Sequence, residues 1–120
     1  MTLVVEDKAA KRIVGMINGI ATNEEKFCDD FITNVSRHDP DGKNLMITGI
    51  QVLPEYRHKG LAKELMKRFL RQEKVKGRRK AFLTCLDEKI GMYQKMGFQD
   101  YGTVSSFWAG MQWHEMTCVL

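Results

Sequence analysis

QVLPEYRHKGLAKELMKRFL, residues 51–70, is the stretch of sequence that decides the fold. It overlaps the end of an apolar run, residues 45–52, which predicts a strand covered on both faces. Pro54 ends that run, and the basic segment 57–62 leads into apolar residues at helical spacing. A strand, a basic glycine-containing turn and a helix in direct succession predict a place to bind a phosphorylated ligand.

The composition predicts one globular domain. A chain of 120 residues can bury one hydrophobic core, so we expect a single domain over residues 1–120. No apolar run approaches the ~20 residues of a membrane span. A charge at Glu6 comes too early for the core of a signal peptide. We therefore expect a cytoplasmic protein with no membrane partner.

The cysteines predict neither a disulfide framework nor a metal site. Cys28, Cys85 and Cys118 are odd in number and widely spaced, without paired ligand spacing. They are expected to be small buried thiols, and no metal is expected.

The basic residues are concentrated in one segment. Residues 57–80 hold eleven Lys and Arg against two Asp and Glu, whereas the rest of the chain holds eight against 13. Such a segment attracts polyanions, either a phosphorylated cofactor or a nucleic acid. The acidic remainder favours a cationic substrate.

The remaining elements follow from periodicity and turn residues. A helix is expected from Leu61 to a stop at Gly77, and a second from an N-cap at Asp87 through Lys95 to Gly97. We expect a hairpin of residues 3–5 and 13–20, a short strand or irregular wall at 31–36, a turn at 38–43, a buried parallel strand at 81–86, and a closing hairpin of 99–107 and 111–119. Residues 78–80 are expected to be a solvated loop. The predicted fold class is α/β with a mixed sheet.

The basic turn has the parts of an anion cradle. A helix N-terminus carries unpaired N–H groups and a partial positive charge. Gly60 and Ala62 let the backbone approach a ligand, and Arg57 and Lys59 add full charges. The turn suits a pyrophosphate, although it has neither the Walker pattern nor the dinucleotide fingerprint.

Two motifs together resemble the GNAT superfamily of N-acetyltransferases. Arg57-x-x-Gly60-x-Ala62 resembles its acetyl-coenzyme A motif, and Tyr93-x-x-x-Gly97-Phe98 is similar to its second signature. Residues 110–116 are similar to the closing strands of bacterial proteins related to aralkylamine N-acetyltransferase. The resemblance implies a GNAT-like fold with N-terminal antiparallel strands, a central β-α-β unit with splayed parallel strands, and a C-terminal helix and β-hairpin.

The resemblance also implies a site and a reaction. Acetyl-coenzyme A would be the cosubstrate, with its pantetheine paired to backbone groups of Ile50 and Val52 like an added strand. Its pyrophosphate would bind the amides of residues 58–63. A primary amine of a small molecule would attack the thioester directly, and Tyr93 would protonate the departing thiolate. The implied cofactor-binding residues are Ile50, Gln51, Val52, Arg57, His58, Lys59, Gly60, Leu61, Ala62 and Lys63.

The sequence departs from the family in two places. Met46 and Thr48 stand where the animal aralkylamine enzymes carry two histidines proposed to relay the amine proton. Proton removal then falls to water, an unplaced group, His38 or Glu55. The chain also starts at the hairpin, without the strand and two helices that usually wall the acceptor site. That wall is therefore missing, minimal or supplied by a partner subunit, and an exposed edge favours a homodimer.

Three functions compete at this point. An acetyl-coenzyme A-dependent N-acetyltransferase acting on a small amine leads. The alternative is a coenzyme A-binding or regulatory module without acetyltransferase activity. A nucleic-acid-binding domain using residues 57–80 is disfavoured, because few aromatic residues interleave with the basic ones.

Overall fold

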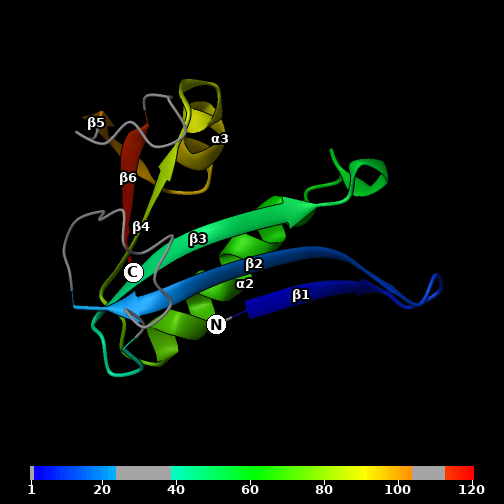
Figure 1. Cartoon of the computed structure of the whole chain (residues 1–120), viewed down its shortest axis with the longest axis horizontal. Helices are drawn as coiled ribbons and strands as arrows, with labels where there is room; N and C mark the ends of the chain where they lie inside the picture. The colour runs from blue at the N-terminus through cyan, green and yellow to red at the C-terminus, as the bar shows by residue number, and fades with distance from the viewer. Residues whose placement is uncertain (1, 24–38, 104–112) are drawn as a thin grey trace.

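The fold is one mixed sheet with a long helix along one face (Figure 1). The computed structural model describes residues 2–23, 39–103 and 113–120. In these residues six strands form one sheet in the order β1-β2-β3-β4-β6-β5. The predicted α/β class is thus confirmed, while the predicted segment at residues 31–36 lies outside the described residues. None of the described helices is long and apolar enough to cross a bilayer.

The N-terminal strands form the predicted hairpin. β1 (Thr2–Asp7) pairs antiparallel with β2 (Arg12–Thr22), and β2 pairs antiparallel with β3 (Asn44–Val52). The turn between β1 and β2 closes on Asp7, whose carboxylate accepts hydrogen bonds from the amides of Ala9 and Ala10 at 3.0 and 3.1 Å. This is the local bonding that favours aspartate at turns.

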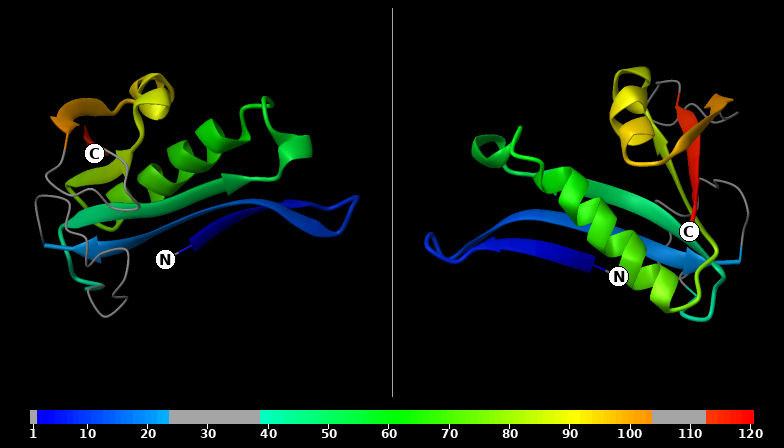
Figure 2. Two further views of the ribbon diagram at one scale, coloured as in Figure 1. Left: turned by 45° about the horizontal axis from the view of Figure 1, so that its top comes forward. Right: turned by 180° about the vertical axis from the view of Figure 1, so that it is seen from behind.

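The central unit confirms the predicted strand, helix and strand. α2 (Leu61–Val75) begins after Gly60, crosses one face of the sheet and returns the chain to β4 (Lys80–Cys85), which runs parallel to β3 (Figure 2). The helix stops before Gly77, whose φ of 97° is the left-handed conformation that glycine adopts at least cost. Leu65, Met66 and Phe69 are its buried apolar face.

The C-terminal part carries a short helix and the closing strands. A 3-10 turn, Asp87–Lys89, leads into α3 (Ile90–Lys95), which is followed by β5 (Gln99–Thr103) and β6 (His114–Val119). β6 lies between β4 and β5 and is antiparallel to both. The predicted closing hairpin is confirmed in its strands, and its turn lies outside the described residues.

The two ends of the predicted second helix had different outcomes. The N-cap at Asp87 was wrong: the chain enters through the 3-10 turn without a side-chain cap, and Asp87 pairs with His114 instead. The stop at Gly97 was right. Its φ is 103°, and the amides of Gly97 and Phe98 bond back to the carbonyls of Gln94 and Tyr93, each at 3.1 Å.

Two further predictions need correction. Only the first half of β3 is buried on both faces, because Thr48 and Gln51 are exposed. Residues 78–80 are not a solvated loop, because Arg78 is 8% exposed and is bound at the end of α2. Its guanidinium donates to the carbonyls of Pro40 and Gly42 at 2.9 and 2.5 Å and faces the fully buried Glu73. A charge buried this way is tolerable because it is paired and hydrogen-bonded.

The main core lies between the sheet and the two helices. It joins β2, β3, β4 and β6 to α2 and α3, and its most buried members are Ile17, Leu45, Phe69, Ala81 and Met116. A smaller cluster of Ile20, Met46 and Phe82 is separate from it. The main core therefore joins β2 and β3 to β4 and β6, the strands on either side of the site described below.

Candidate active site

The sheet opens between its two parallel strands. β3 and β4 pair only from Asn44 and Lys80 to Met46 and Phe82, after which the strands diverge (Figure 1). The Leu53 amide donates to the Val14 carbonyl at 2.9 Å, so it faces β2. Because main-chain direction alternates along a strand, the main-chain groups of Val52 and Ile50 face the opening. These are the groups predicted to pair with pantetheine.

One cavity of about 520 Å³ lies at this opening. Nine of the ten predicted cofactor-binding residues, all but Lys59, line it, and so does Tyr93. Tyr56, Lys89, Met92 and Met96 complete the lining. The two sequence motifs, separated by a helix and a strand in the chain, therefore meet at one site.

The turn before α2 has two residues in the left-handed conformation. His58 has φ 62° and Gly60 has φ 79°. This conformation costs a non-glycine residue ~1–2 kcal/mol, and consecutive amides in such turns form anion-binding concavities. A Cβ built on Gly60 would meet no protein atom within 4 Å, so the space beside it is open. α2 starts without a side-chain cap bond, which leaves its first amides for a ligand.

Arg57 and Lys59 do more than add charge to the turn. The Arg57 guanidinium donates from Nε to the Val52 carbonyl at 3.0 Å, and thereby fixes the end of β3. Lys59 does not line the cavity; its ammonium lies 5.4 Å from the centre of the Tyr56 ring. Such a cation–π contact contributes ~0.5–1 kcal/mol at an exposed site.

A tether that the sequence analysis missed holds this turn to the hairpin. Tyr56, at the end of the 3-10 turn Pro54–Tyr56, donates from its hydroxyl to the Asp7 carboxylate at 2.5 Å. This hydrogen bond lowers the pKa of Asp7 and raises the pKa of Tyr56. Arg12 lies 5.6 Å from the same ring and pairs with Glu55. No local pattern signals these contacts, because they join residues more than 40 positions apart.

The candidate bases receive little support. Glu55 does not line the cavity, and a hydrogen bond from its own amide and the contact with Arg12 lower its pKa. Met46 is buried against Ile20 and Phe82, and Thr48 donates to the Asn18 side-chain oxygen at 3.4 Å. His38 lies outside the described residues.

Tyr93, the predicted proton donor, is a buried residue of the cavity wall. It is 9% exposed, and its ring meets Phe98 edge to face at 6.1 Å between centres. Burial, with a smaller contribution from Cys85, raises the pKa of Tyr93 to about 12. The phenol therefore keeps its proton at neutral pH.

Cys85 lies behind this wall as an unreactive thiol. Burial first, then Asp100 and Asp87, raise the pKa of Cys85 to about 11, so very little thiolate is present at neutral pH. His114 stands opposite Cys85 in the β4–β6 ladder, but both of its ring nitrogens are held by carboxylates. Among the described residues, His114 is therefore not free to act as the base of an acyl-cysteine route.

His114 clamps three segments of the C-terminal part. Its Nδ1 lies 3.1 Å from the Asp100 carboxylate on β5, and its Nε2 contacts Asp87 in the turn after β4. The hydrogen bond with Asp100 is the main cause of the raised pKa of His114. A hydrogen bond from the Gly102 amide is the main cause of the lowered pKa of Asp100, and the hydrogen bond with His114 is the second. In the described residues, no group of His, Cys, Asp and Glu side chains is arranged to hold a metal ion.

Comparison with known proteins identifies the family. Residues 1–100 match the family described as "Acetyltransferase (GNAT) domain". The chain belongs to the GNAT acetyltransferase family. The GNAT-like fold inferred from the two motifs is thereby confirmed.

Solved structures of GNAT-type acetyltransferases share this fold. An acetyltransferase from Bacillus cereus is 23% identical, with a TM-score of 0.71, over 100% of this chain and 72% of that one. A variant of the spermidine N-acetyltransferase from Vibrio cholerae is 22% identical, with a TM-score of 0.70, over 98% of this chain and 64% of that one. Nourseothricin acetyltransferase is 19% identical with a TM-score of 0.72. At these identities the likeness concerns the fold alone.

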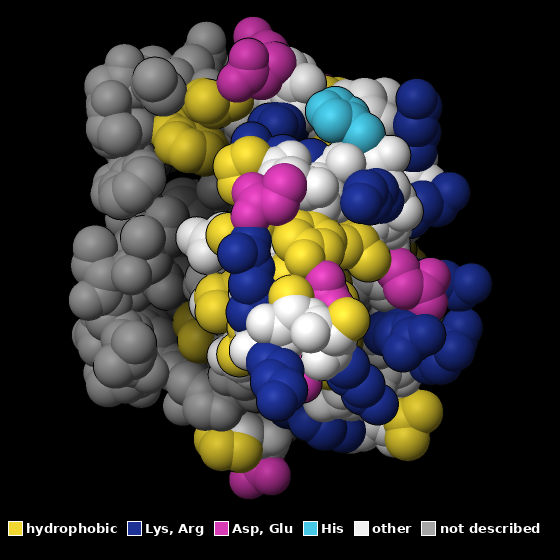
Figure 3. Space-filling model, turned by 90° about the vertical axis from the view of Figure 1, so that its right-hand side faces the viewer, with side chains coloured by type: hydrophobic (Ala, Val, Ile, Leu, Met, Phe, Trp, Pro, Cys, Tyr) yellow, Lys and Arg dark blue, Asp and Glu magenta, His cyan; other side chains and the backbone are white. Residues whose placement is uncertain are grey.

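The family cosubstrate fits what this cavity offers. Acetyl-coenzyme A needs main-chain partners for an extended pantetheine and amides for a pyrophosphate. β3 turns the main-chain groups of Ile50 and Val52 to the opening, and Gly60 leaves space at an uncapped helix start. Figure 3 shows the molecule from the side that carries this turn, with Lys and Arg side chains gathered around exposed apolar ones.

Proposed function

We propose that this GNAT domain transfers an acetyl group from acetyl-coenzyme A to a primary amine of a small molecule by direct attack. The observation that carries the proposal is the single cavity on which the open β3 edge, the left-handed turn and Tyr93 converge. Acetyl-coenzyme A, when bound, supplies the activated acetyl thioester.

The residues of the β3 side hold the cosubstrate. Ile50 and Val52 offer main-chain hydrogen bonds, and the amides of residues 58–63 take the pyrophosphate at the start of α2. Lys63 and Arg57 add positive charge at the cavity wall. Arg57 keeps its bond to Val52, so it supports the strand end as well as the anion.

Tyr93 acts on the departing sulfur. Its raised pKa, about 12, lies well above that of an ordinary thiol, about 8.5. The hydroxyl therefore donates a hydrogen bond to the sulfur as negative charge develops there. Full transfer of its proton to the thiolate is uphill by this pKa difference, so it is completed only as the proton lost by the amine returns to Tyr93 through water. Burial on the cavity wall keeps this donor in place.

The acceptor amine loses its proton without a histidine relay. Met46 and Thr48 are not bases, and Glu55 pairs with Arg12, which leaves water, His38 or an unplaced group to take the proton. Only the neutral amine attacks, and activity should rise with pH through the ionisation of the amine itself.

The acceptor class is a cationic primary amine. Asp87, with its side chain 83% exposed, and Asp100 both lie close enough to Cys85 to raise its pKa and share a single partner, His114, so the wall behind Tyr93 has two carboxylates around one imidazole. A similar structure is named for spermidine, an amine, and the tail at residues 110–116 resembles aralkylamine-related proteins. The narrower aralkylamine assignment stays a prediction.

Release of free thiol from acetyl-coenzyme A tests this function. Turnover is expected with one or more amines in a panel of arylalkylamines, polyamines and amino-acid amides. Thermal shift with coenzyme A measures cofactor binding separately, and a salt-matched oligonucleotide should give no comparable shift. A cofactor-induced shift without turnover of any amine would favour the alternative of a coenzyme A-binding or regulatory module.

We further propose a cytoplasmic homodimer. β1 is an edge strand of the described sheet, with Val4 43% exposed, and open edges invite pairing. Light scattering of the purified chain should give twice the monomer mass, and a monomer at micromolar concentration would contradict the dimer.

A further inference from the structure

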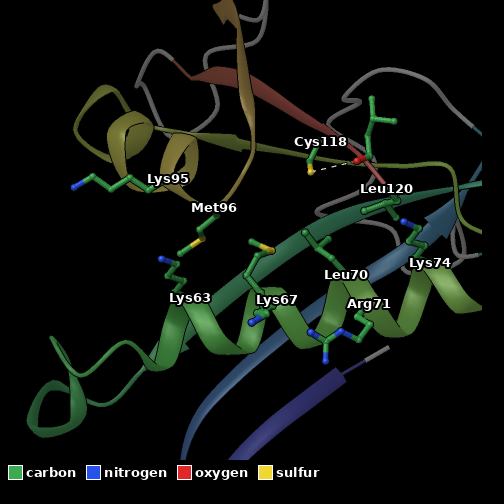
Figure 4. A pocket seen from close by; sticks show the side chains of 11 residues that line it. Lys63, Lys67, Leu70, Arg71, Lys74, Lys95, Met96, Cys118 and Leu120 are labelled. Carbon is green, nitrogen blue, oxygen red and sulfur yellow. Dashed lines mark hydrogen bonds between the residues drawn. The ribbon is translucent and has the colours of Figure 1, made fainter.

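A second hollow lies beside the cavity at the β3 opening and shares Lys63 and Met96 with it. Its volume is about 450 Å³, and it runs between α2, the end of α3 and the end of β6. Figure 4 shows Leu70, Met96 and Leu120 turned toward the space between these elements. We call this hollow the α2 groove, defined by its apolar floor of Met66, Leu70, Met96, Cys118 and Leu120 and its cationic rim of Lys63, Lys67, Arg71, Lys74 and Lys95.

The rim of the α2 groove is positively charged along its whole length. Lys63, Lys67, Arg71 and Lys74 are spaced by four, four and three residues on one face of α2, and Lys95 adds a charge from α3. Among the described residues, no Asp or Glu side chain lines the groove. None of the five cations has an ion-pair partner among residues 2–23, 39–103 and 113–120. The neighbouring Glu64 is paired with Arg68 instead.

The floor and rim together select the chemistry of a ligand. A small anion such as phosphate gains nothing from a floor of methionine, leucine and cysteine side chains. A single-headed fatty acid needs cations at one end, whereas these are spread over about 16 Å of α2 at the helical rise per residue. Single-stranded nucleic acid binds by base stacking on aromatic side chains, and the described lining has none.

We propose that the α2 groove docks an acidic amphipathic helix of a partner protein. Three turns of such a helix match the span from Lys63 to Lys74, with apolar side chains on the floor and carboxylates against the rim. Methionine floors adapt to differing apolar partners, and Met66 and Met96 supply two here. Lys63 and Met96 also line the cofactor cavity, so the docked helix would end beside it.

Fluorescence anisotropy with a labelled peptide tests this proposal. The probe is a peptide of about 15 residues with leucines at i, i+3, i+4 and i+7 and glutamates on both flanks. The permuted control has the same composition without that periodicity. Saturable binding of the probe, about tenfold tighter than that of the permuted peptide, is expected. No saturable binding, or equal binding of both peptides, would overturn the proposal.

Charge-reversal variants locate the contact. Lys67→Glu/Arg71→Glu changes two exposed rim cations and should weaken probe binding at least about tenfold. Lys8→Glu/Lys43→Glu makes the same change of net charge at exposed positions away from the groove and should leave binding unchanged. Equal loss in both variants would show a non-specific charge effect and overturn the site. Lys67→Ala/Arg71→Ala serves if the reversal unfolds the chain, with a circular dichroism melt as the check.

Competition separates the α2 groove from the cofactor cavity. Saturating coenzyme A should leave the labelled peptide bound to the wild-type protein. Complete displacement by coenzyme A would assign the groove to the cofactor site and refute an independent docking surface. Because the peptide assay needs no turnover, its failure and a failure of the acetyltransferase proposal are distinguishable.

Discussion

The two walls of the cofactor cavity are built in opposite ways. The β3 wall comes from one continuous piece of chain, residues 50–63, in which strand, turn and helix start follow each other. The opposite wall presents Tyr93 from α3 and is held by Cys85, His114 and Asp100 on three different strands. The proposed cofactor contacts therefore depend on local sequence, whereas the position of the proposed proton donor depends on the whole C-terminal part being folded. Four predictions test this division.

The largest expected effect is on the wall that presents Tyr93. Tyr93→Phe removes the only predicted proton donor and should lower kcat by about 10²-fold or more. Cofactor affinity, measured by calorimetry, should stay within about twofold, because no polar contact of the hydroxyl with the β3 wall is required. Tyr101→Phe, on an exposed tyrosine of β5, is the control and should leave kcat unchanged. A fall in affinity with unchanged kcat would make Tyr93 a binding residue instead.

The second-largest effect concerns the β3 wall, residues 50–63. Gly60→Ala places a Cβ in the open space at the turn and should weaken coenzyme A binding about tenfold, while left-handed strain costs ~1 kcal/mol of stability. Gly77→Ala is a matched control at the other end of α2, with φ 97° and equally open surroundings. It should lose similar stability in a denaturant titration and keep its cofactor affinity. Equal weakening in both variants would show that stability alone sets the affinity.

A smaller effect is expected from the tether. Tyr56→Phe removes the hydrogen bond to Asp7 and frees the turn from the hairpin, so cofactor affinity should fall about threefold with little change in kcat. Asp7→Ala should have a similar effect. The double variant should be no worse than either single one, because both remove the same contact. Additive losses would show that the two side chains act independently.

The smallest effect is a pH dependence of stability. Because the pKa of His114 is raised above about 6.5, its pairing stabilises the fold fully below that pH and loses this contribution as pH rises through the folded-state value. His114→Gln should lower the melting temperature near pH 6 more than near pH 9. A constant difference between wild type and variant across this range would show that the contribution of His114 is packing alone.

The same division explains what the sequence could predict. The β3 wall could be predicted from the sequence because Arg57, Gly60 and Ala62 lie next to the strand and helix that position them. Tyr93 was found only through a second motif with fixed spacing to Gly97 and Phe98. Helix ends marked by Gly77 and Gly97 were also readable, since the left-handed conformation is a local requirement.

Contacts between segments far apart in the chain could not be predicted from the sequence. Asp87 has the sequence signature of an N-cap, yet its carboxylate pairs with His114 instead of capping the helix. Arg78 reads as a loop residue, yet it is buried because α2 ends over the carbonyls of Pro40 and Gly42. In each case a charged side chain pairs with a group that is distant in the sequence, so local propensities cannot predict the contact.

Because β3 and β4 diverge, the second half of β3 does not pair with β4, and a bound ligand can take the place of a neighbouring strand there. The described ladder between them ends at Met46 and Phe82, while β3 runs on to Val52. A ligand that pairs with Ile50 and Val52 would therefore serve as a structural member of the fold as well as a reactant. Its binding would slow amide hydrogen exchange along β3 and raise resistance to unfolding, so the concentration of the cosubstrate would govern the lifetime of the protein together with its turnover.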